Sequence, residues 1–537
     1  MNSQPHQASC HAPIRPATGA FRRQDDHAPK RPCAEAPKRQ SSHAMAIRCL
    51  ALALILLAAS ACASRQETPP PAAGDPLAAL RTAIDAALGD SALARSRAGI
   101  KVVSLTSGEV LYERDSHLLF HPASNMKLLS TAIALQRLGT DYSYRTLVGT
   151  DSGAAVDSVV RGPLYLKGFG NPDLIDSDLR GLAETLRRDG IRRVDGPLVC
   201  DATYFDDLPW GYGWMWDDVS AWYWAPISAL TVNDNCVEVT VAPGDSVGAP
   251  LNVSLVPETA FMAIDDLGST VAPDDSAALE DFSVQRQWRP IAGNVVEITG
   301  GMAVGSRPRT WTIDVVDAPR YTGNRFLELL AAEGIAIRGG IEVDTMPESA
   351  QLLAEHRSEP LTDIVINTNK VSDNLSAEAL LKSAGAAWQG PPGTAEKGIS
   401  AIYAYMDSVG IDSTSYRLAD GSGVSRYNVI TPELLVALLE AMAADYRVAA
   451  EYKTSLPIAG VDGTLRYRMR GTAAEGKLRA KTGTLSGVSS LSGYTTTADG
   501  EELAFSMIME HFVTASRPIR DVQDRIGALL SGFSRTP

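Results

Sequence analysis

The chain has 537 residues, of which 45% are hydrophobic and 21% are charged, and its formal net charge is −14 at pH 7. This length predicts two or three domains, and the composition is that of a folded globular protein rather than a disordered or fibrous one. Long apolar stretches do not recur, which excludes a polytopic membrane protein, and the acidic balance repels phosphate, so no nucleic-acid partner is expected.

The N-terminal region contains a predicted export signal. The run "MAIRCLALALILLAASAC" begins at Met45 with a short basic start, continues through an apolar core and ends in small residues, the pattern of a signal peptide over residues 45–62. Residues 1–44 are polar and would not normally precede such a signal, so we expect a non-native, disordered extension before it. Residues 63–77 are predicted to form a proline-rich linker.

The end of the signal allows two interpretations. The segment "LLAASAC" is similar to a bacterial lipobox in which Cys62 would carry a lipid, although Ala59 stands where a leucine is usual. Plain cleavage after an A-x-A site would instead release a soluble secreted protein. The sequence therefore predicts a periplasmic or secreted protein, with a membrane tether at Cys62 as one of two alternatives.

The first predicted elements of the folded body are a helix and a hairpin. Helical periodicity begins at Pro76 in "PLAALRTAIDAALGDSALA", and the strands "GIKVVSLT" and "EVLYERD" are joined by a Ser-Gly turn. A second helix is predicted to begin near Ser124 in "HPASNMKLLSTAIALQRL", because Pro122 suits the start of a helix.

The middle of the chain has a different pattern. Between residues 145 and 355 short β-like runs alternate with turns, which predicts one or two inserted β-rich domains. The loop "WGYGWMWDDVSAWYW" at 210–224 concentrates tryptophans, and such a cluster is more typical of packing than of a sugar-stacking surface. Cys200 and Cys236 could form a disulfide in an oxidising compartment or remain as two buried free thiols.

The last third returns to helices and then to strands. Helical patterns occupy "NLSAEALLKSAGAAW" and "GISAIYAYMDSVG", and strands are predicted in "KLRAKTGTLSG", "SSLSGYTTT" and "ELAFSMIMEH", followed by a helix from about Arg517. We therefore predict an α/β fold, in which residues 78–144 and 356–537 form one layered α+β domain. Its antiparallel sheet is flanked by helices, and the β-rich insertion interrupts it.

Three short motifs stand in order along the chain. They are S-N-M-K from Ser124 to Lys127, S-D-N from Ser372 to Asn374, and K-T-G from Lys481 to Gly483. Each alone is easily explained as a helix cap or a surface lysine. Together, with the first at a helix start and the last on a strand, they indicate serine acyl-transfer chemistry.

The first motif supplies a nucleophile and a base. Residues three apart lie on one helix face, so Lys127 can reach the Ser124 hydroxyl. An ordinary lysine is protonated at neutral pH, but partial burial and a neighbouring cation, for which Lys481 is the candidate, would leave some neutral amine to activate the serine. Free N–H groups at Ser124 and near Thr484 are expected to stabilise the developing negative charge.

The other two motifs are predicted to hold the substrate. Gly483 leaves room for a substrate backbone to lie along its strand, while Lys481 and the Thr482 hydroxyl are placed to hold a carboxylate. The Ser372 hydroxyl can relay a proton to the leaving amine, and Asn374 can bind a substrate amide. Neither an H-E-x-x-H nor a C-x-x-C pairing occurs in the sequence, so we expect no metal and no cofactor.

Longer runs extend these motifs into a resemblance. The runs "SDNLSAEALL", "RLADGSGVSRYNVITPELL", "LPIAGVDGTLRYRMRG", "RAKTGTLSGVSSLSGY" and "YWAPISALTVNDN" resemble the low-molecular-mass class C penicillin-binding proteins, which are D-alanyl-D-alanine carboxypeptidases and endopeptidases. The resemblance covers about Ala78 to Phe533. It implies a DD-peptidase/β-lactamase-like fold, Ser124 as the acylated nucleophile and Lys127 as its proton acceptor.

The same resemblance implies the partners. Members of the family cleave the stem peptides and crosslinks of peptidoglycan through an acyl-enzyme, and β-lactams inhibit them covalently. The run "DGSG" at Asp420 is interpreted as a loop that shapes the cleft. Two rivals remain: a serine β-lactamase, disfavoured by the large insertion and the lack of an E-x-x-x-N loop, and a non-catalytic cell-wall-binding protein with a decayed site.

Overall fold

A computed structural model of the chain describes residues 75–216, 220–287 and 293–536. The predictions for the extension, the signal peptide, Cys62 and nearly all of the linker concern residues that lie outside this part. Within the described ranges, no helix combines the length and the apolar character needed to cross a bilayer.

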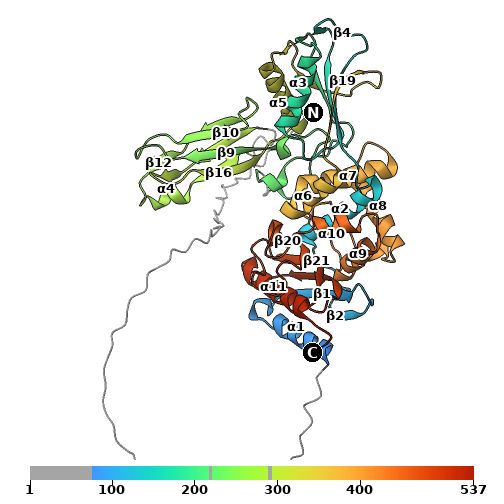
Figure 1. Cartoon of the computed structure of the whole chain (residues 1–537). Helices are drawn as coiled ribbons and strands as arrows, with labels where there is room; N and C mark the ends of the chain where they lie inside the picture. The colour runs from blue at the N-terminus through green and yellow to red at the C-terminus, as the bar shows by residue number, and fades with distance from the viewer. Residues whose placement is uncertain (1–74, 217–219, 288–292, 537) are drawn as a thin grey trace, which may run out of the picture. The chain divides into compact units, whose positions relative to one another are not determined.

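The two ends of the folded body share one sheet (Figure 1), in which five strands follow the order β2-β1-β22-β21-β20 and all neighbours are antiparallel. Its strands are β1 (Arg97–Ser104), β2 (Val110–Arg114), β20 (Arg479–Leu485), β21 (Val488–Thr496) and β22 (Glu502–Glu510). Residues of both faces of β21 and β22 are buried, because helices cover the sheet on each side. The predicted antiparallel sheet flanked by helices is confirmed.

Helices form the two layers on this sheet. They are α1 (Pro76–Leu88), α2 (Met126–Leu138), α6 (Leu361–Asn367), α7 (Asn374–Gln389), α8 (Ala395–Ser408), α9 (Pro432–Ala444), α10 (Ala449–Ser455) and α11 (Ser516–Gly532). Helix α11 packs on β21 and against α1, whereas α9 packs on β22 and β1. Helix α2 contacts α6, α7, α8 and α9, and every residue from Met126 to Leu135 is buried. The lysine of the first motif is therefore held inside the helical layer.

Short polar side chains set the starts of these helices. Asp75 and Thr431 accept hydrogen bonds from the backbone N–H groups of Leu77 and Leu434, and a proline follows each of them as the first helical residue. Aspartate and threonine are favoured helix caps because their side-chain oxygens accept from the free N–H groups at a helix start, and proline suits the first helical position because it has no N–H.

The insertion contains two larger sheets and several small ones. Its strands are β3 (Arg145–Thr150), β4 (Ala155–Val156), β5 (Val159–Val160), β6 (Leu164–Gly168), β7 (Arg193–Val194), β8 (Leu198–Asp201), β9 (Cys236–Ala242), β10 (Asn252–Val256), β11 (Ala263–Asp266), β12 (Ser269–Val271), β13 (Ser283–Arg286), β14 (Val295–Thr299), β15 (Gly301–Ala303), β16 (Arg309–Asp314), β17 (Ala336–Ile337), β18 (Ile341–Val343) and β19 (Gln351–Arg357). The largest sheet follows the order β18-β8-β6-β3-β19, and β17-β7-β5-β4 forms a second. Strands β10, β9 and β16 lie side by side in Figure 1.

Three helices of the insertion were not predicted from the sequence. They are α3 (Asp176–Arg188), α4 (Ser276–Glu280) and α5 (Ala318–Ala332). Helix α3 buries Leu179, Leu182, Ala183 and Leu186, the spacing of one helical face, and packs on α5 and β19. The apolar spacing of α3 is therefore present in the sequence. The helix was missed because the short β-like runs around it led to a prediction of strands for the whole region.

The two cysteines of the folded body do not form the disulfide that was one of the two predicted alternatives. Both are free and buried. Cys200 lies in β8 and Cys236 begins β9, in strands of different sheets. Each contacts α5 separately: a side chain at Gly323 would meet the Cys200 sulfur, whereas the Tyr321 hydroxyl donates to the Cys236 carbonyl. Burial raises the pKa of both thiols, so neither is a reactive thiolate.

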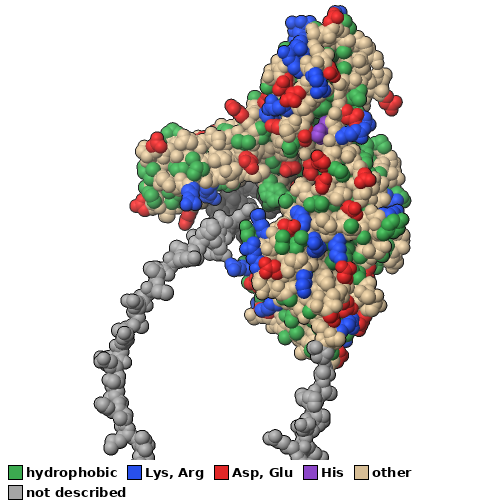
Figure 2. All heavy atoms as spheres, viewed as in Figure 1, with side chains coloured by type: hydrophobic (Ala, Val, Ile, Leu, Met, Phe, Trp, Pro, Cys, Tyr) green, Lys and Arg blue, Asp and Glu red, His purple; other side chains and the backbone are tan. Residues whose placement is uncertain are grey.

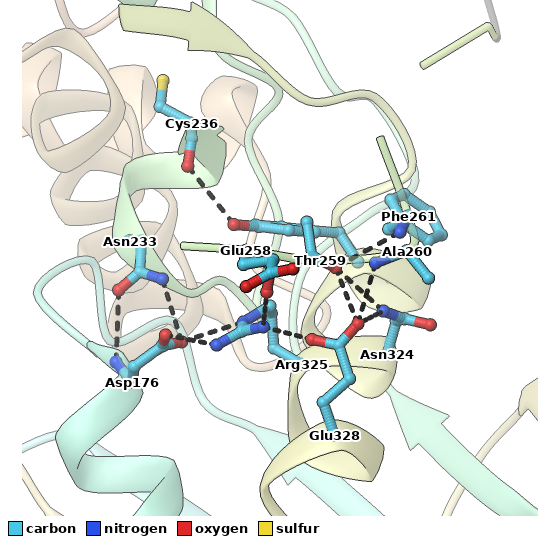
Figure 3. A network of polar contacts seen from close by, with 11 residues as sticks. Asp176, Asn233, Cys236, Glu258, Thr259, Ala260, Phe261, Asn324, Arg325 and Glu328 are labelled. Atoms are coloured by element: carbon cyan, nitrogen blue, oxygen red, sulfur yellow. Dashed lines mark hydrogen bonds and ion pairs between the residues drawn. The ribbon is translucent and has the colours of Figure 1, made fainter. Parts of the chain in front are cut away.

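A polar network ties α5 to the neighbouring elements of the insertion (Figure 3). The buried Arg325 guanidinium donates to Asp176 Oδ2 at 2.6 Å and to the Glu258 carbonyl at 2.8 Å, and it also pairs with Glu328. Asn233 in turn donates to Asp176 Oδ1 at 2.9 Å. Arg325 therefore joins α5 to the start of α3 and to the segment after β10, and Asp176 extends the network to the turn before β9.

Replacing Arg325 with methionine is expected to lower the free energy of unfolding by about 3 kcal/mol, because two carboxylates would lose their common partner. Urea unfolding measures this loss. Arg180→Met is the matched control, since Arg180 is about half-exposed and lies 3.7 Å from Glu333, and an exposed pair contributes about 1 kcal/mol or less. Equal, small losses in both variants would contradict the role given to Arg325.

Charges of both signs are intermixed on the face of the molecule drawn in Figure 2. Blue and red side chains stand next to each other over most of the described surface on this face. This face therefore carries no large field of a single sign.

Candidate active site

Ser124 lies in a short 3₁₀ turn, Ala123–Asn125, immediately before α2. The preceding residue, Ala123, has a φ of 48°, an uncommon left-handed conformation for a residue with a side chain. Two glycines allow this turn to be packed closely. A Cβ at Gly423 would stand 1.9 Å from the Ala123 carbonyl oxygen, and one at Gly483 would stand 2.9 Å from the Ser124 nitrogen.

Gly483 also has a packing role that was not predicted, and the predicted room for a substrate backbone stays a prediction. Its missing side chain would also meet Ser490 Oγ of β21 at 2.2 Å and the Pro122 carbonyl oxygen at 2.8 Å. The space that the glycine leaves is filled by the turn that carries Ser124 and by the adjacent strand. The K-T-G motif thus needs its glycine so that β20 can lie against Ser124.

Lys127 stands one helical turn after Ser124 and is fully buried. Its Nζ donates to Ser124 Oγ at 3.1 Å, to Asn374 Oδ1 at 2.6 Å and to the Ser422 carbonyl oxygen at 2.8 Å. All three acceptors are uncharged groups, and burial without a carboxylate in contact disfavours the ammonium form. The first two motifs are thus joined through the side chains of Lys127 and Asn374.

Burial lowers the pKa of Lys127 to about 8, although the charges of Asp373, Asp420 and Glu378 oppose the change. The predicted lowering is present, but burial rather than a neighbouring cation causes it. A pKa near 8 leaves a useful fraction of neutral amine at neutral pH. Lys127 can then accept the proton of Ser124 Oγ.

Lys481 is buried on β20 and is held by the second motif. Its Nζ donates to Ser372 Oγ at 2.7 Å and to the Thr482 carbonyl oxygen at 3.0 Å. Burial, and then the charge of Lys127, lower the pKa of Lys481 well below its ordinary value. The structure thus groups Lys127 with Ser124 and Asn374, and Lys481 with Ser372. Ser124, Ser372 and Asn374 line one cleft.

Ser372 is free to meet Lys481 because its neighbour caps the helix. The Asp373 carboxylate accepts from the Ser376 N–H at 2.6 Å and caps α7, which excludes the simple alternative that Ser372 is the cap. Ser372 itself ends a π-helical segment, Thr368–Ser372, with a φ of 68°. Such π-helical turns and left-handed residues concentrate at functional sites.

A cleft of about 520 Å³ opens over these groups. It is lined by Ser124, Met215, Trp222, Tyr223, Val371, Ser372, Asn374, Gly423, Val424, Arg426, Thr464, Thr482, Thr484, Leu485 and Ser486. Strand β20 ends the sheet on this side. Its first residues pair with the segment around Ile458, so the part from Lys481 onward is the edge at which a strand could be added. On that strand Thr484 is exposed, and the Thr482 hydroxyl donates to Thr464 Oγ1 at 2.8 Å.

The comparisons with known proteins agree with this geometry. A model of the D-Ala-D-Ala carboxypeptidase 3 (S13) family matches residues 80–531. The chain belongs to this family. It is a serine-type D-Ala-D-Ala carboxypeptidase of the low-molecular-mass penicillin-binding proteins, and the family predicted from the resemblance is confirmed.

Several carboxypeptidases are similar to this chain over most of their length. The D-alanyl-D-alanine carboxypeptidase of Actinomadura sp. (strain R39) is 37% identical over 477 residues, which are 86% of each chain. The carboxypeptidase DacB of Haemophilus influenzae is 27% identical over 421 residues, 78% of this chain and 86% of that one. The crystal structure of penicillin-binding protein 4 from H. influenzae superimposes with a TM-score of 0.74 at 25% identity, covering 84% and 99% of the two chains.

The tryptophan-rich loop of the carboxypeptidase combines packing with the rim of the cleft. Trp210 stacks on the buried Trp224 with ring centroids 4.5 Å apart, and Trp214 Nε1 donates to Asp420 Oδ2 at 3.0 Å. Trp216 and Trp222 remain largely exposed. The packing interpretation therefore holds for part of the loop only.

Two partners of the clustered motif residues were missed from the sequence. The Ser422 carbonyl binds Lys127, and the Tyr223 carbonyl accepts from Asn374 Nδ2 at 2.8 Å. Both ends of the Asn374 amide are occupied in this structure, one by Lys127 and one by Tyr223. The residue also lines the cleft, and its binding of a substrate amide stays a prediction. Backbone carbonyls leave no signature in a sequence, although the "DGSG" run marked the right loop.

Proposed function

We propose that Ser124 is the nucleophile of this carboxypeptidase and that neutral Lys127 is its base. The observation that carries the proposal is the contact between a buried Lys127 Nζ and Ser124 Oγ at 3.1 Å. Lys127 takes the hydroxyl proton while Ser124 Oγ attacks the carbonyl carbon of the bond between two D-alanines. The backbone N–H groups of Ser124 and Thr484 stabilise the oxyanion.

The second and third motifs complete the reaction in this proposal. Lys481 holds the Ser372 hydroxyl, which passes a proton to the nitrogen of the departing D-alanine as the C–N bond breaks. Ser372 regains a proton from the Lys481 ammonium that it contacts. A water molecule then attacks the Ser124 ester. Ser124 Oγ takes its proton back from Lys127 as the shortened peptide leaves, and the proton lost by the water restores Lys481. Thr482 and Lys481 lie beside the place where the terminal carboxylate of the substrate would bind.

The acylation rate is expected to rise with pH through a midpoint near 8, since the pKa of Lys127 is lowered to about 8 by burial and only the neutral amine accepts a proton. Well below this midpoint the rate should fall about tenfold for each pH unit. Labelling with a fluorescent penicillin at a series of pH values measures it, with spontaneous penicillin hydrolysis as the control. A rate that does not change across neutral pH would contradict Lys127 as the base.

We further propose that the natural substrates are the stem peptides and crosslinks of peptidoglycan, and that β-lactams acylate Ser124. Support comes from the family and from the H. influenzae penicillin-binding protein 4, which has been solved in complex with a β-lactam. Such substrates lie outside the cytoplasmic membrane, so export by residues 45–62 remains part of the proposal. Within this proposal, a lipid on Cys62 and plain cleavage of the signal peptide stay the two alternatives for the mature N-terminus.

The intact mass of the protein after incubation with benzylpenicillin tests the proposal. A stable adduct on the peptide that contains Ser124 is expected, and digestion of purified muropeptides then separates trimming of stem peptides from cleavage of crosslinks. Destruction of the antibiotic without an adduct would indicate a β-lactamase. If no adduct forms and the antibiotic is not consumed, the protein would be a wall-binding protein with an inactive site.

A further inference from the structure

Glu378 is a fully buried acidic residue beside the catalytic set. It lies on α7 one helical turn after Asn374, so the two side chains share a face of the helix. Its Oε1 accepts hydrogen bonds from the backbone N–H groups of Gly421 at 2.9 Å and Ser422 at 2.8 Å. Its Oε2 is buried and has no hydrogen-bond partner among the described residues. A carboxylate with one oxygen unpartnered in the interior is costly and requires a reason.

The backbone that Glu378 holds is the backbone that holds Lys127. The N–H of Ser422 donates to Glu378, and the carbonyl of the same residue accepts from Lys127 Nζ at 2.8 Å. The neighbouring carbonyl of Gly421 accepts from Ser130 Oγ on α2 at 2.5 Å. Glu378 and Ser130 thus anchor one short segment to α7 and to α2, and that segment fixes one of the three acceptors around the lysine.

The charges around Lys127 come from several elements. Asp373 precedes α7, Glu378 lies within it, Asp420 lies in the loop before α9, and Lys481 faces the set from β20. Burial and then the charge of Asp420 raise the pKa of Glu378 to about 7. Asp420 is already committed to the Gly423 N–H, the Ser425 N–H and Asn428 Nδ2, whereas the hydrogen bonds of Glu378 all go to the Gly421–Ser422 segment.

We propose that Glu378 is a positioning residue for Lys127: it holds the Ser422 carbonyl against the lysine and supplies a buried negative charge that sets the pH range of acylation. The inference rests on the proposed role of Lys127 as the base. At the pH where Lys127 loses its proton, Glu378 is ionised, and its charge favours the ammonium form. Removing that charge should let Lys127 deprotonate, and Ser124 react, at lower pH.

The decisive variant is Glu378→Gln. The amide oxygen still accepts from the Gly421 and Ser422 N–H groups, but the negative charge is lost. The midpoint of the pH profile for acylation by a fluorescent penicillin is expected to move to lower pH by about one pH unit. An unmoved midpoint, whatever the rate, would overturn the proposal.

Two further variants separate charge from support of the loop. Ser130→Ala removes the neutral contact to the Gly421 carbonyl, and Glu378→Asp keeps the charge on a shorter side chain, so both should slow acylation without moving the midpoint. A midpoint that moves in either variant would show that displacement of the loop is sufficient and would overturn the proposal. If Glu378→Gln does not fold, Glu378→Asp and Ser130→Ala still test the proposal, because a moved midpoint in either variant would overturn it. Failure of the wild-type protein to form any adduct would contradict the proposed function itself.

Discussion

Ser124→Ala is expected to abolish the penicillin adduct and to lower the release of D-alanine from a peptide ending in D-Ala-D-Ala by about 10⁴-fold or more, the loss that follows removal of a catalytic nucleophile. The fold should be unchanged. The lost atom is one partly buried hydroxyl oxygen, whose contact in this structure is with Lys127, and the close packing of the turn involves backbone atoms that alanine retains.

The matched control is Ser486→Ala, because Ser486 lines the same cleft and is exposed. Its hydroxyl makes no contact with a lysine among the described residues, so the variant should keep both the adduct and the peptidase activity. Intact mass and a D-alanine assay measure both proteins in parallel. An adduct that persists in Ser124→Ala on another residue would assign the nucleophile elsewhere.

Much of the sheet and the catalytic set could be predicted from local patterns. The strands around Lys481 and the helices that follow Ser124 and Ser372 carry clear periodicities, and the structure has them close to the predicted bounds. Order along the chain mattered as well: strands at both ends with an insertion between them imply one sheet completed by distant segments. The antiparallel pairing of β1 with β22, from Arg97 opposite Glu510 to Ser104 opposite Leu503, joins the two ends of the chain in this sheet.

The parts that could not be predicted depend on contacts across long separations. The Asn374 amide donates to the Tyr223 carbonyl of the insertion and accepts from Lys127 on α2. No local pattern around the S-D-N motif reveals either partner. The helical face that Glu378 shares with Asn374 was readable from "SDNLSAEALL", yet its partners lie more than forty residues further along the chain, at Gly421 and Ser422. Gly483 is a second example. The K-T-G motif indicates that a glycine is required, but it does not reveal that the turn carrying Ser124 packs against that position.

Lys127→Met is expected to slow acylation of Ser124 by about 10³-fold, within the range that a positioned general base contributes. Methionine fills a similar volume but cannot accept the hydroxyl proton. Labelling with a fluorescent penicillin over hours, rather than minutes, measures the residual rate. Because Ser124 and the cleft are retained, the adduct should still form on Ser124, slowly.

A second buried lysine provides the control that separates base from structural ion. Lys382 is also buried on α7, but its Nζ lies 2.5 Å from Asp206 Oδ1, and it donates to the Leu208 carbonyl at 2.8 Å. A lysine paired with a carboxylate is stabilised as the ammonium, whereas Lys127 contacts a hydroxyl, an amide oxygen and a carbonyl. Lys382→Met should therefore reduce stability and leave the acylation rate of the folded protein near that of the wild type. Normal labelling of Lys127→Met would instead assign the base to Lys481, the other lysine whose pKa burial lowers.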